Sequence, residues 1–469
     1  MTDAFDTSVG RSRLIERSIA TRALLMRGAA LAALAVSGLP APVRAGYTAV
    51  SIWLPPPGNT FTNSGVINGT PNGVWITTPL TAFTNTTTGA IKAQGSDGYG
   101  IISEASIGTL TNSGTISAAF PVLFTYGSMT LLNNTGQLVG LGTIGQGLAN
   151  QIATISTIKN AGEITQFAIG VFNIQGNSQG NSEITTLANS GVISAAYTAI
   201  RNADTAGTLT NMGTISGGRY GLYNNQSFGL ITNDTGATIS AGQGVAGIYN
   251  VGSLGSLSNS GTIGAQQYGL FNAGTIGPLN NNAGGTITGG NGTFGVYNRG
   301  TMGSVTNGGL IIAGYTGFYN SGRISGLSNT GTITSLNNAG GKITGGTSGI
   351  GNSRQMTTLT NTGVISGTVY GVNNIGPNAS ISSLNNLAGG TITGSNTGVS
   401  NTGSIGTLSN SGVISGAVNA INSFYVLTNI QNAGTINGNI SIFPVTSAPY
   451  QTYITITGAT SNGLGTLTG

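Results

Sequence analysis

Residues Leu209–Ser216 read LTNMGTIS, and close variants of this phrase recur along most of the chain. The variants are LTNSGTIS at Leu110–Ser117, LANSGVIS at Leu187–Ser194, LSNSGTIG at Leu257–Gly264, LTNTGVIS at Leu359–Ser366 and LSNSGVIS at Leu408–Ser415. The Asn residues of successive phrases are separated by 22 positions from Asn189 to Asn211 and by 26 from Asn233 to Asn259. Self-similarity at such a period is typical of a solenoid.

Each repeat has the periodicity of β-strands. Apolar and turn residues occupy every second position, as in Leu110, Asn112, Gly114 and Ile116, and a period of two belongs to strands. A second phrase, Gly-apolar-aromatic-Asn, marks another part of the repeat, for example GLYN ending at Asn224. Two Asn-marked bends and the Gly after Ile divide each coil into about three strands.

The pattern therefore predicts an all-β, right-handed parallel β-helix of about 22–26 residues per coil. The handedness is that of known solenoids with this coil length. Asn side chains at equivalent bends are expected to stack into hydrogen-bonded ladders along the axis.

Residues 1–45 have the composition of a signal peptide. An apolar run at 28–39 is too short to span a bilayer, and Val43-Arg44-Ala45 offers small residues for cleavage. The arginines before the run are Arg11, Arg13, Arg17, Arg22 and Arg27. An amphipathic N-terminal helix is the alternative, but the abrupt change to Gly, Asn and Thr after Ala45 favours export.

Three further segments are expected after the signal peptide. Residues 46–62, with Trp53 and three prolines at 55–57, resemble a cap that blocks strand stacking at the solenoid end. Residues 63–438 form the repeat region. Residues 439–469 are interpreted as a C-terminal cap or as the start of a truncated linker.

Composition excludes several kinds of chemistry. The chain has no Cys and no His, so zinc sites and Cys-His or Ser-His-Asp catalysis lack their ligands or base. Charged residues make up 5% of the chain, against about 25% in typical globular proteins. Without residues 1–45, eight basic and six acidic groups remain, a net charge of +2. No nucleic-acid partner and no cofactor are expected.

The acidic residues leave one enzymatic alternative, a carbohydrate-active β-helix enzyme resembling a polysaccharide lyase or hydrolase. Glycosidases need two carboxylates at a defined separation, and the acids of the mature chain are scattered instead. They are Asp97, Glu104, Glu163, Glu183, Asp204 and Asp234. The sequence therefore predicts a protein that is not an enzyme, with no catalytic and no metal-binding residues.

An aromatic residue precedes the second Asn in five successive coils. Since Leu222 should point inward, its neighbour Tyr223 should point outward, and the five rings should form a stripe. The stripe consists of Tyr223, Tyr249, Phe271, Tyr297 and Tyr319. These residues are the candidate binding site, for surface glycans, for a protein partner or for self-association. Ring stacking that only reinforces the rod is the alternative.

Two other features have competing explanations. Thr-x-Thr pairs on several coils resemble the arrays of ice-binding solenoids, but Val, Leu and Lys interrupt them, and Thr favours exposed strand positions in any case. The pairs are Thr286 and Thr288, Thr332 and Thr334, and Thr391 and Thr393. At 330–338 the period is broken, which predicts an inserted loop or an extra strand.

The LTNSGTISG-like coils, the signal peptide and the lack of Cys together resemble the passenger region of bacterial autotransporters (type V secretion). The resemblance covers roughly residues 63–438 and implies a Gram-negative surface protein displayed by an outer-membrane translocator barrel. No barrel-like segment follows the repeats, so the translocator is expected to be missing from this chain or to be a separate chain. The resemblance also implies that residues 439–469 can be the start of an autochaperone region, which seeds folding outside the cell.

The expected function is that of a secreted, non-catalytic passenger, either an adhesin or a structural stalk, located at the cell surface, on the outer membrane or outside the cell. A purely structural or ice-binding rod and the carbohydrate-active enzyme are the alternatives.

Overall fold

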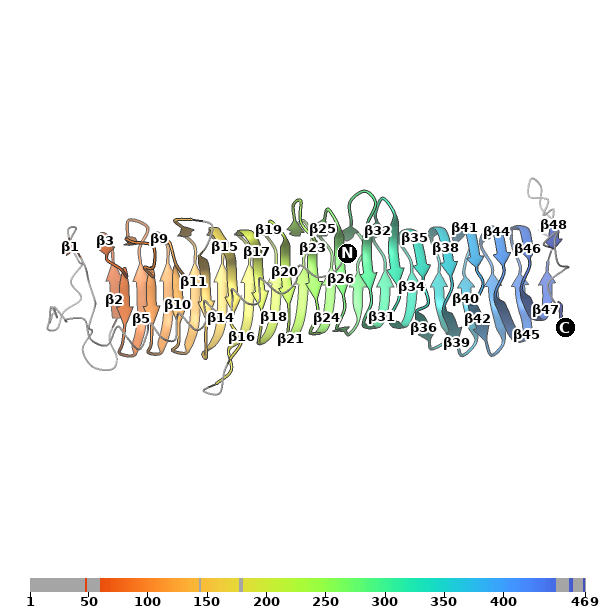
Figure 1. The fold of residues 1–469 in the computed structure, drawn as a ribbon, viewed down its shortest axis with the longest axis horizontal. Coiled ribbons are helices and arrows are strands. Elements are labelled where there is room, and N and C mark those ends of the chain that lie inside the picture. The colour runs from red at the N-terminus through yellow and green to blue at the C-terminus, as the bar shows by residue number, and fades with distance from the viewer. Residues whose placement is uncertain are drawn as a thin grey trace.

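The computed structural model describes residues 60–142, 145–176 and 180–443, and the strands Tyr47–Thr48, Thr455–Gly458 and Leu467–Thr468. The predicted signal peptide and most of both predicted end segments lie outside these residues. The described chain is all-β and winds into one long rod (Figure 1). Among the described residues, no helix has the length and apolarity needed to cross a membrane.

All strands belong to two parallel sheets. Sheet A contains β1 (Tyr47–Thr48), β3 (Val66–Gly69), β4 (Val74–Ile76), β6 (Ala90–Ala93), β7 (Ile101–Ser103), β9 (Thr115–Ala118), β10 (Leu123–Thr125), β12 (Gln137–Gly140), β13 (Gln146–Asn150), β15 (Glu163–Asn173), β17 (Val192–Asn202), β19 (Thr214–Gly217), β20 (Tyr220–Asn224), β22 (Thr238–Ala241), β23 (Ala246–Asn250), β25 (Thr262–Ala265), β26 (Tyr268–Asn272), β29 (Thr286–Thr288), β30 (Phe294–Asn298), β32 (Leu310–Ile312), β33 (Thr316–Asn320), β35 (Thr332–Asn338), β38 (Gln355–Asn361), β41 (Ser380–Asn386), β44 (Ser404–Asn410), β46 (Leu427–Asn432) and β48 (Thr455–Gly458). Sheet B contains β2 (Thr60–Asn63), β5 (Leu80–Asn85), β8 (Ile107–Asn112), β11 (Met129–Asn134), β14 (Thr154–Asn160), β16 (Glu183–Asn189), β18 (Thr205–Asn211), β21 (Ser227–Asn233), β24 (Ser253–Asn259), β27 (Thr275–Ile276), β28 (Leu279–Asn281), β31 (Thr301–Asn307), β34 (Arg323–Asn329), β36 (Lys342–Gly345), β37 (Ser348–Asn352), β39 (Val364–Gly367), β40 (Tyr370–Asn374), β42 (Thr391–Gly394), β43 (Thr397–Asn401), β45 (Val413–Ser423), β47 (Thr435–Ile442) and β49 (Leu467–Thr468).

The parallel β-helix predicted from the repeats is confirmed, with about sixteen turns. A typical coil has three strands, for example β18, β19 and β20. The two short strands β19 and β20 belong to the same sheet, because both pair with the continuous strand β17 of the preceding coil. Each coil therefore has two sides, one in each sheet, and the right-handed winding stays a prediction.

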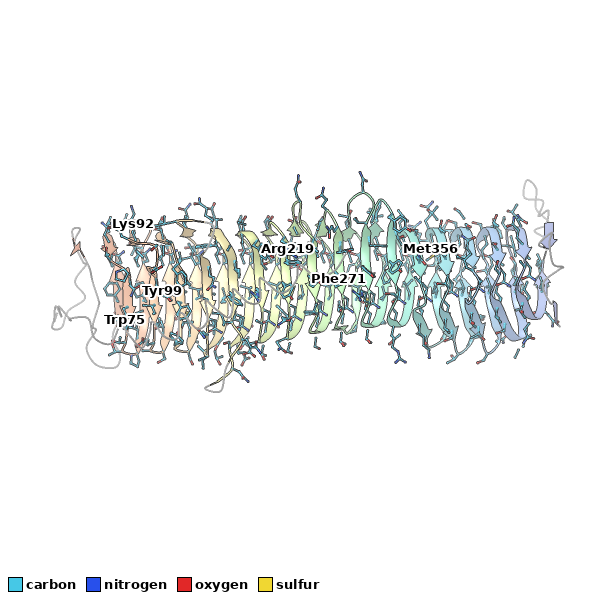
Figure 2. All side chains as sticks on the ribbon, viewed as in Figure 1. Trp75, Lys92, Tyr99, Arg219, Phe271 and Met356 are labelled. Atoms are coloured by element: carbon cyan, nitrogen blue, oxygen red, sulfur yellow. The ribbon has the colours of Figure 1, made fainter. Side chains whose placement is uncertain are left out.

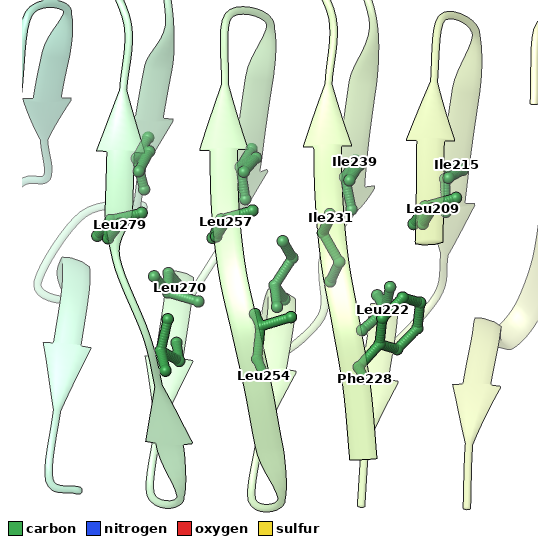
Figure 3. Packing of buried hydrophobic residues seen from close by; sticks show 14 of the residues in the cluster. Leu209, Ile215, Leu222, Phe228, Ile231, Ile239, Leu254, Leu257, Leu270 and Leu279 are labelled. Atoms are coloured by element: carbon green, nitrogen blue, oxygen red, sulfur yellow. The ribbon is translucent and has the colours of Figure 1, made fainter. Parts of the chain in front are cut away.

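Both sides of a coil present the same inward pattern. On sheet B, strand β18 buries Ala206, Leu209 and Asn211. On sheet A, Ile215 of β19 and Leu222 of β20 are fully buried, and Asn224 follows at the bend. These apolar side chains stack on those of the coils above and below (Figure 3). Full burial is worth roughly 1.5–3 kcal/mol per aliphatic side chain before chain entropy is subtracted, so no coil is stable without its neighbours.

Two Asn ladders run along the rod, one at each bend, as the sequence predicted. Each Nδ2 donates to Oδ1 of the Asn one turn later, for example Asn211 to Asn233 at 2.8 Å, and the same amide also donates to nearby backbone carbonyls. One ladder runs from Asn63 to Asn401 and ends on Ser423. The other runs from Asn150 to Asn432. The ladders satisfy the amides that the bends bury.

The irregularity at 330–338 is an extra strand and not a loop. Strand β35 lies inside sheet A and pairs with both β32 and β33 of the coil before it. Two successive sides of the coil, β34 in sheet B and β35 in sheet A, are thus each formed by one continuous strand of seven residues. The next side is formed by the two short strands β36 and β37, which pair with β34 on sheet B. From here on, the Leu-x-Asn strands lie in sheet A, whereas before this point they lie in sheet B.

Candidate binding surface

The five residues of the predicted stripe lie in register on consecutive strands of sheet A. Tyr223, Tyr249, Phe271, Tyr297 and Tyr319 pair in that order from β20 to β33. None of them belongs to the solenoid core, whereas their neighbours Leu222 and Ile248 do. The strand alternation therefore places the rings on the outer side of sheet A.

A second column of rings lies beside the stripe, which the sequence analysis missed. Tyr220, Tyr268 and Phe294 each stand three residues before a stripe residue and align across the same strands. Tyr220 lies 5.2 Å from Tyr223 and Tyr268 lies 5.4 Å from Phe271, between ring centroids. The three-residue spacing is visible in the sequence and could have revealed this column.

Ring orientation changes along the stripe. Tyr223 and Tyr249 stack with planes 7° apart, and Tyr249 and Phe271 with planes 11° apart. Tyr297 is turned edge-on, at 86° both to Phe271 and to Tyr319. Both faces of Tyr249 are thus occupied by Tyr223 and Phe271. The Arg201 guanidinium lies over the Tyr223 ring at 6.0 Å, and Tyr297 packs edge-on against Phe271, so little ring face is left there for a sugar or a base.

The cluster is partly covered, and not an open row as the sequence suggested. Phe271 is 6% exposed and Tyr220 is 5% exposed, whereas Tyr315 is 65% exposed and Tyr197 is 40% exposed. Burial raises the pKa of Tyr220 to about 12 and also raises the pKa of Tyr223, Tyr249 and Tyr268. Their hydroxyl groups therefore remain hydrogen-bond donors at neutral pH.

Arginines lie among these rings. The guanidinium of Arg219 lies 5.4 Å from the Tyr197 ring centroid and 5.2 Å from that of Tyr220, and its Nη1 donates a hydrogen bond to the Tyr197 hydroxyl. Arg201 occupies the stripe position next to Tyr223, and its guanidinium lies 4.8 Å from the Phe172 ring. Figure 2 places Arg219 and Phe271 in the middle part of the rod.

A third arginine, Arg299, is exposed and comes directly after the Asn298 bend that follows Tyr297. Burial raises the pKa of Tyr249 and of Tyr268, and the positive charge of Arg299 opposes this rise. We call the whole set the aromatic–arginine cluster: Tyr197, Arg201, Arg219, Tyr220, Tyr223, Tyr249, Tyr268, Phe271, Phe294, Tyr297, Arg299, Tyr315 and Tyr319. It combines apolar ring area with cationic hydrogen-bond donors.

The acidic residues have local structural contacts. Asp204 Oδ2 accepts hydrogen bonds from the backbone N–H groups of Gly176 and Ser182 at 2.7 and 2.8 Å, which ties these two residues together. Glu163 accepts a hydrogen bond from Gln137, and Glu183 accepts one from Thr185. Within residues 60–142, 145–176 and 180–443, no three acidic side chains gather in a way that could hold a metal ion.

The Thr pairs do not form one array. Thr286, Thr288, Thr332 and Thr334 lie in sheet A, with Leu310 between Thr286 and Thr332 in the same column. The pair Thr391 and Thr393 lies in sheet B, because the repeats have changed sides by then.

A shallow groove of about 700 Å³ lies around Thr393, Ser415 and Asn437 on sheet B, and no ring lines it. A second shallow groove has a volume of about 620 Å³. It crosses the start of the sheet A strands around Thr286, Thr332 and Arg354, and its walls consist mainly of glycine and hydroxyl residues. No ring lines it, so the aromatic–arginine cluster is the stronger candidate for a binding surface.

In comparisons with known proteins, no family model, no curated protein and no solved structure matches the chain.

Proposed function

We propose that the protein is an exported, non-catalytic rod at the bacterial cell surface, and that it acts as an adhesin with its aromatic–arginine cluster as the contact surface. The observation that carries this proposal is the position of that cluster: half-exposed rings and arginines on the outer side of a long, regular scaffold. Aromatic and Arg side chains are the ones that most often anchor binding surfaces.

The scaffold suits display at a distance. About sixteen turns at a strand spacing of roughly 4.8 Å give a rod on the order of 75 Å long. The core is one continuous cluster from Phe61 to Ile436, and the ladders join consecutive coils along the same length. Such a rod holds a contact surface away from its anchoring point. The resemblance to autotransporter passengers supports export and surface location.

Export is tested first, by sequencing the N-terminus of the protein recovered from the cell surface and by adding protease to intact cells. A mature chain starting at Gly46 and cleaved by external protease is expected. A chain that keeps its first 45 residues inside the cell contradicts the proposal.

Attachment is tested with a deletion strain that is complemented with variants of the full chain. Replacing the exposed rings Tyr197 and Tyr315 and the partly exposed ring Tyr319 by Ser should reduce attachment and self-aggregation of the cells. Replacing three exposed residues elsewhere, Met212, Val364 and Val413, by Ser provides the control. If both variants attach as the wild type does, while shortening the rod by whole coils abolishes attachment, the protein is a structural stalk and not an adhesin.

A further inference from the structure

We infer that the aromatic–arginine cluster binds a polyanionic glycan, meaning a polysaccharide that bears carboxylate or sulfate groups along its chain. This inference rests on the proposed adhesin function and names the chemistry of its ligand.

Charge distribution is the first argument. The described rod has few charges, and two of its cations, Arg201 and Arg219, lie against rings of this cluster. A third, the exposed Arg299, follows Tyr297 by two residues. The charged side chains that act on the pKa values of Tyr223 and Tyr249 are these arginines. A cationic surface on a rod with so little charge elsewhere attracts anions, and partial burial limits screening by salt.

Fixed geometry is the second argument. The Arg219 guanidinium lies against both the Tyr197 and the Tyr220 ring and donates to the Tyr197 hydroxyl, so it loses little freedom when it binds. The Arg201 guanidinium is likewise placed against the ring of Phe172. A planar guanidinium in a fixed position matches the two oxygens of a carboxylate or sulfate better than a mobile lysine does.

Ring orientation decides between classes of ligand. Neutral sugars and nucleic-acid bases bind to aromatic residues mainly by stacking on exposed ring faces. In the stack of Tyr223, Tyr249 and Phe271 the inner faces are covered, and Arg201 lies over the Tyr223 ring at the end of the stack. What the stacked rings offer is a row of ring edges, with hydroxyl groups on Tyr223 and Tyr249, that repeats at the strand spacing of about 4.8 Å. A pyranose unit has nearly this length, so a polysaccharide along the axis can present one unit to each coil.

The test measures binding of the purified full-length chain to immobilised polymers by surface plasmon resonance. The polymers are polygalacturonate, dextran sulfate, neutral dextran and a single-stranded oligothymidylate. The variant R201Q/R219Q/R299Q removes the cluster's cations. The control K92Q/R323Q/K342Q removes the same charge from exposed positions outside the cluster. R299Q alone, at an exposed bend, provides a second variant if the triple variant fails to fold.

The expected result is binding to polygalacturonate, to dextran sulfate or to both, weakening with added salt, with little binding to neutral dextran. The cluster variant should lose about tenfold or more in affinity, the effect of one or two charge-assisted hydrogen bonds, and R299Q should lose a smaller part. The control should stay near the wild type. Binding to polygalacturonate alone assigns carboxylate as the recognised group, and binding to dextran sulfate alone assigns sulfate.

Four results overturn the inference: no binding to either polyanion, equal losses in the cluster and control variants, equal binding to neutral dextran, or preference for the oligothymidylate. The adhesin proposal is judged separately by the attachment of living cells. A rod that attaches through its rings but ignores both polyanions retains the proposed function and refutes only the glycan assignment.

Discussion

The side-chain amide of Asn320 donates a hydrogen bond of 2.8 Å to Oδ1 of Asn338, which lies only 18 residues further along the chain. Other ladder bonds span 22 residues or more, as from Asn298 to Asn320. The separation is only 18 residues because β34 and β35 are each a single seven-residue strand that forms a whole side of the coil, with no pair of short strands between them. Asn329 meanwhile bonds to Asn352 across 23 residues, so both ladders continue without a break while the repeat phrases change sheets.

Deleting residues 330–338 should therefore give a folded rod whose repeats no longer change sides. The remaining segment 339–352 would follow β34 directly and place Asn352 after Asn320 in the sheet A ladder. Both sides of a coil bury the same apolar and Asn pattern, so the loss in melting temperature should be a few degrees at most. Deleting 334–338 alone removes Leu336 and Asn338 but leaves Ile333, and this control should unfold much more easily.

Pairs of engineered cysteines can show which strands are neighbours in the wild type and in the deletion variant, since the natural chain has no cysteine. Ser328 and Gly351 are direct neighbours in the wild type, so S328C/G351C should form a disulfide there. In the nine-residue deletion, Y319C/G351C should form one instead. A disulfide between 328 and 351 in the deletion variant would contradict the register.

Asn259 offers a test of what a ladder contributes. It accepts from Asn233 at 2.9 Å and donates to Asn281 at 2.8 Å, and all three side chains are buried. Replacing it by Ala leaves a donor and an acceptor without partners, at a cost of roughly 2–5 kcal/mol.

Replacing Asn259 by Ser should cost less, since Ser423 accepts the last bond of this ladder naturally. The exposed Asn282 provides the control, because its Ala variant should change stability by about 0.5 kcal/mol or less. Thermal melting and hydrogen exchange in β21 and β28 measure the effect. Equal stabilities of the two Ala variants would show that the ladder contributes nothing beyond solvation.

The repeats allowed the sequence to predict the parallel β-helix, the inward Leu and Ile residues, and the Asn ladders. It could not predict the change of sides at β35, because both sides of a coil share one inward pattern and the repeat period alone does not distinguish them. The spacing of successive Asn bends does distinguish them: Asn320 and Asn329 are nine positions apart, and Asn329 and Asn338 are again nine positions apart.

The stripe itself was predictable, but its arginines were not recognised. Arg201 occupies the position that Tyr223 occupies one coil later, which a strict alignment of coils reveals. Arg219 instead comes from the variable segment between β19 and β20, where coils differ in length. Its contact with Tyr197 depends on how that segment packs, and a sequence repeat carries no information on this.

Gly213 tests how tightly the bends stack. A Cβ atom at this position would lie 2.2 Å from the carbonyl oxygen of Gly191 in the preceding coil. Replacing Gly213 by Ala forces the two backbones apart and should cost about 1–3 kcal/mol. A Cβ atom at Gly242 would meet nothing within 4 Å beyond its own chain neighbours, so the Ala variant there should match the wild type within about 0.5 kcal/mol. Urea unfolding of both variants gives the comparison, and equal midpoints would show that the bends can relax.

Alkaline pH should destabilise the aromatic–arginine cluster. Burial raises the pKa of Tyr220 from 10.0 in the free side chain to about 12 in the folded protein. Between these two values the unfolded chain has lost the proton while the folded one keeps it, so stability falls as pH rises from about 10 to about 12. Below pH 10 this stabilising contribution is complete. Phenolate absorbance and melting temperature, followed over this range, should show late ionisation together with a falling melting point. Replacing Tyr220 by Phe should flatten the decline, and an unchanged decline in that variant would assign it to other tyrosines.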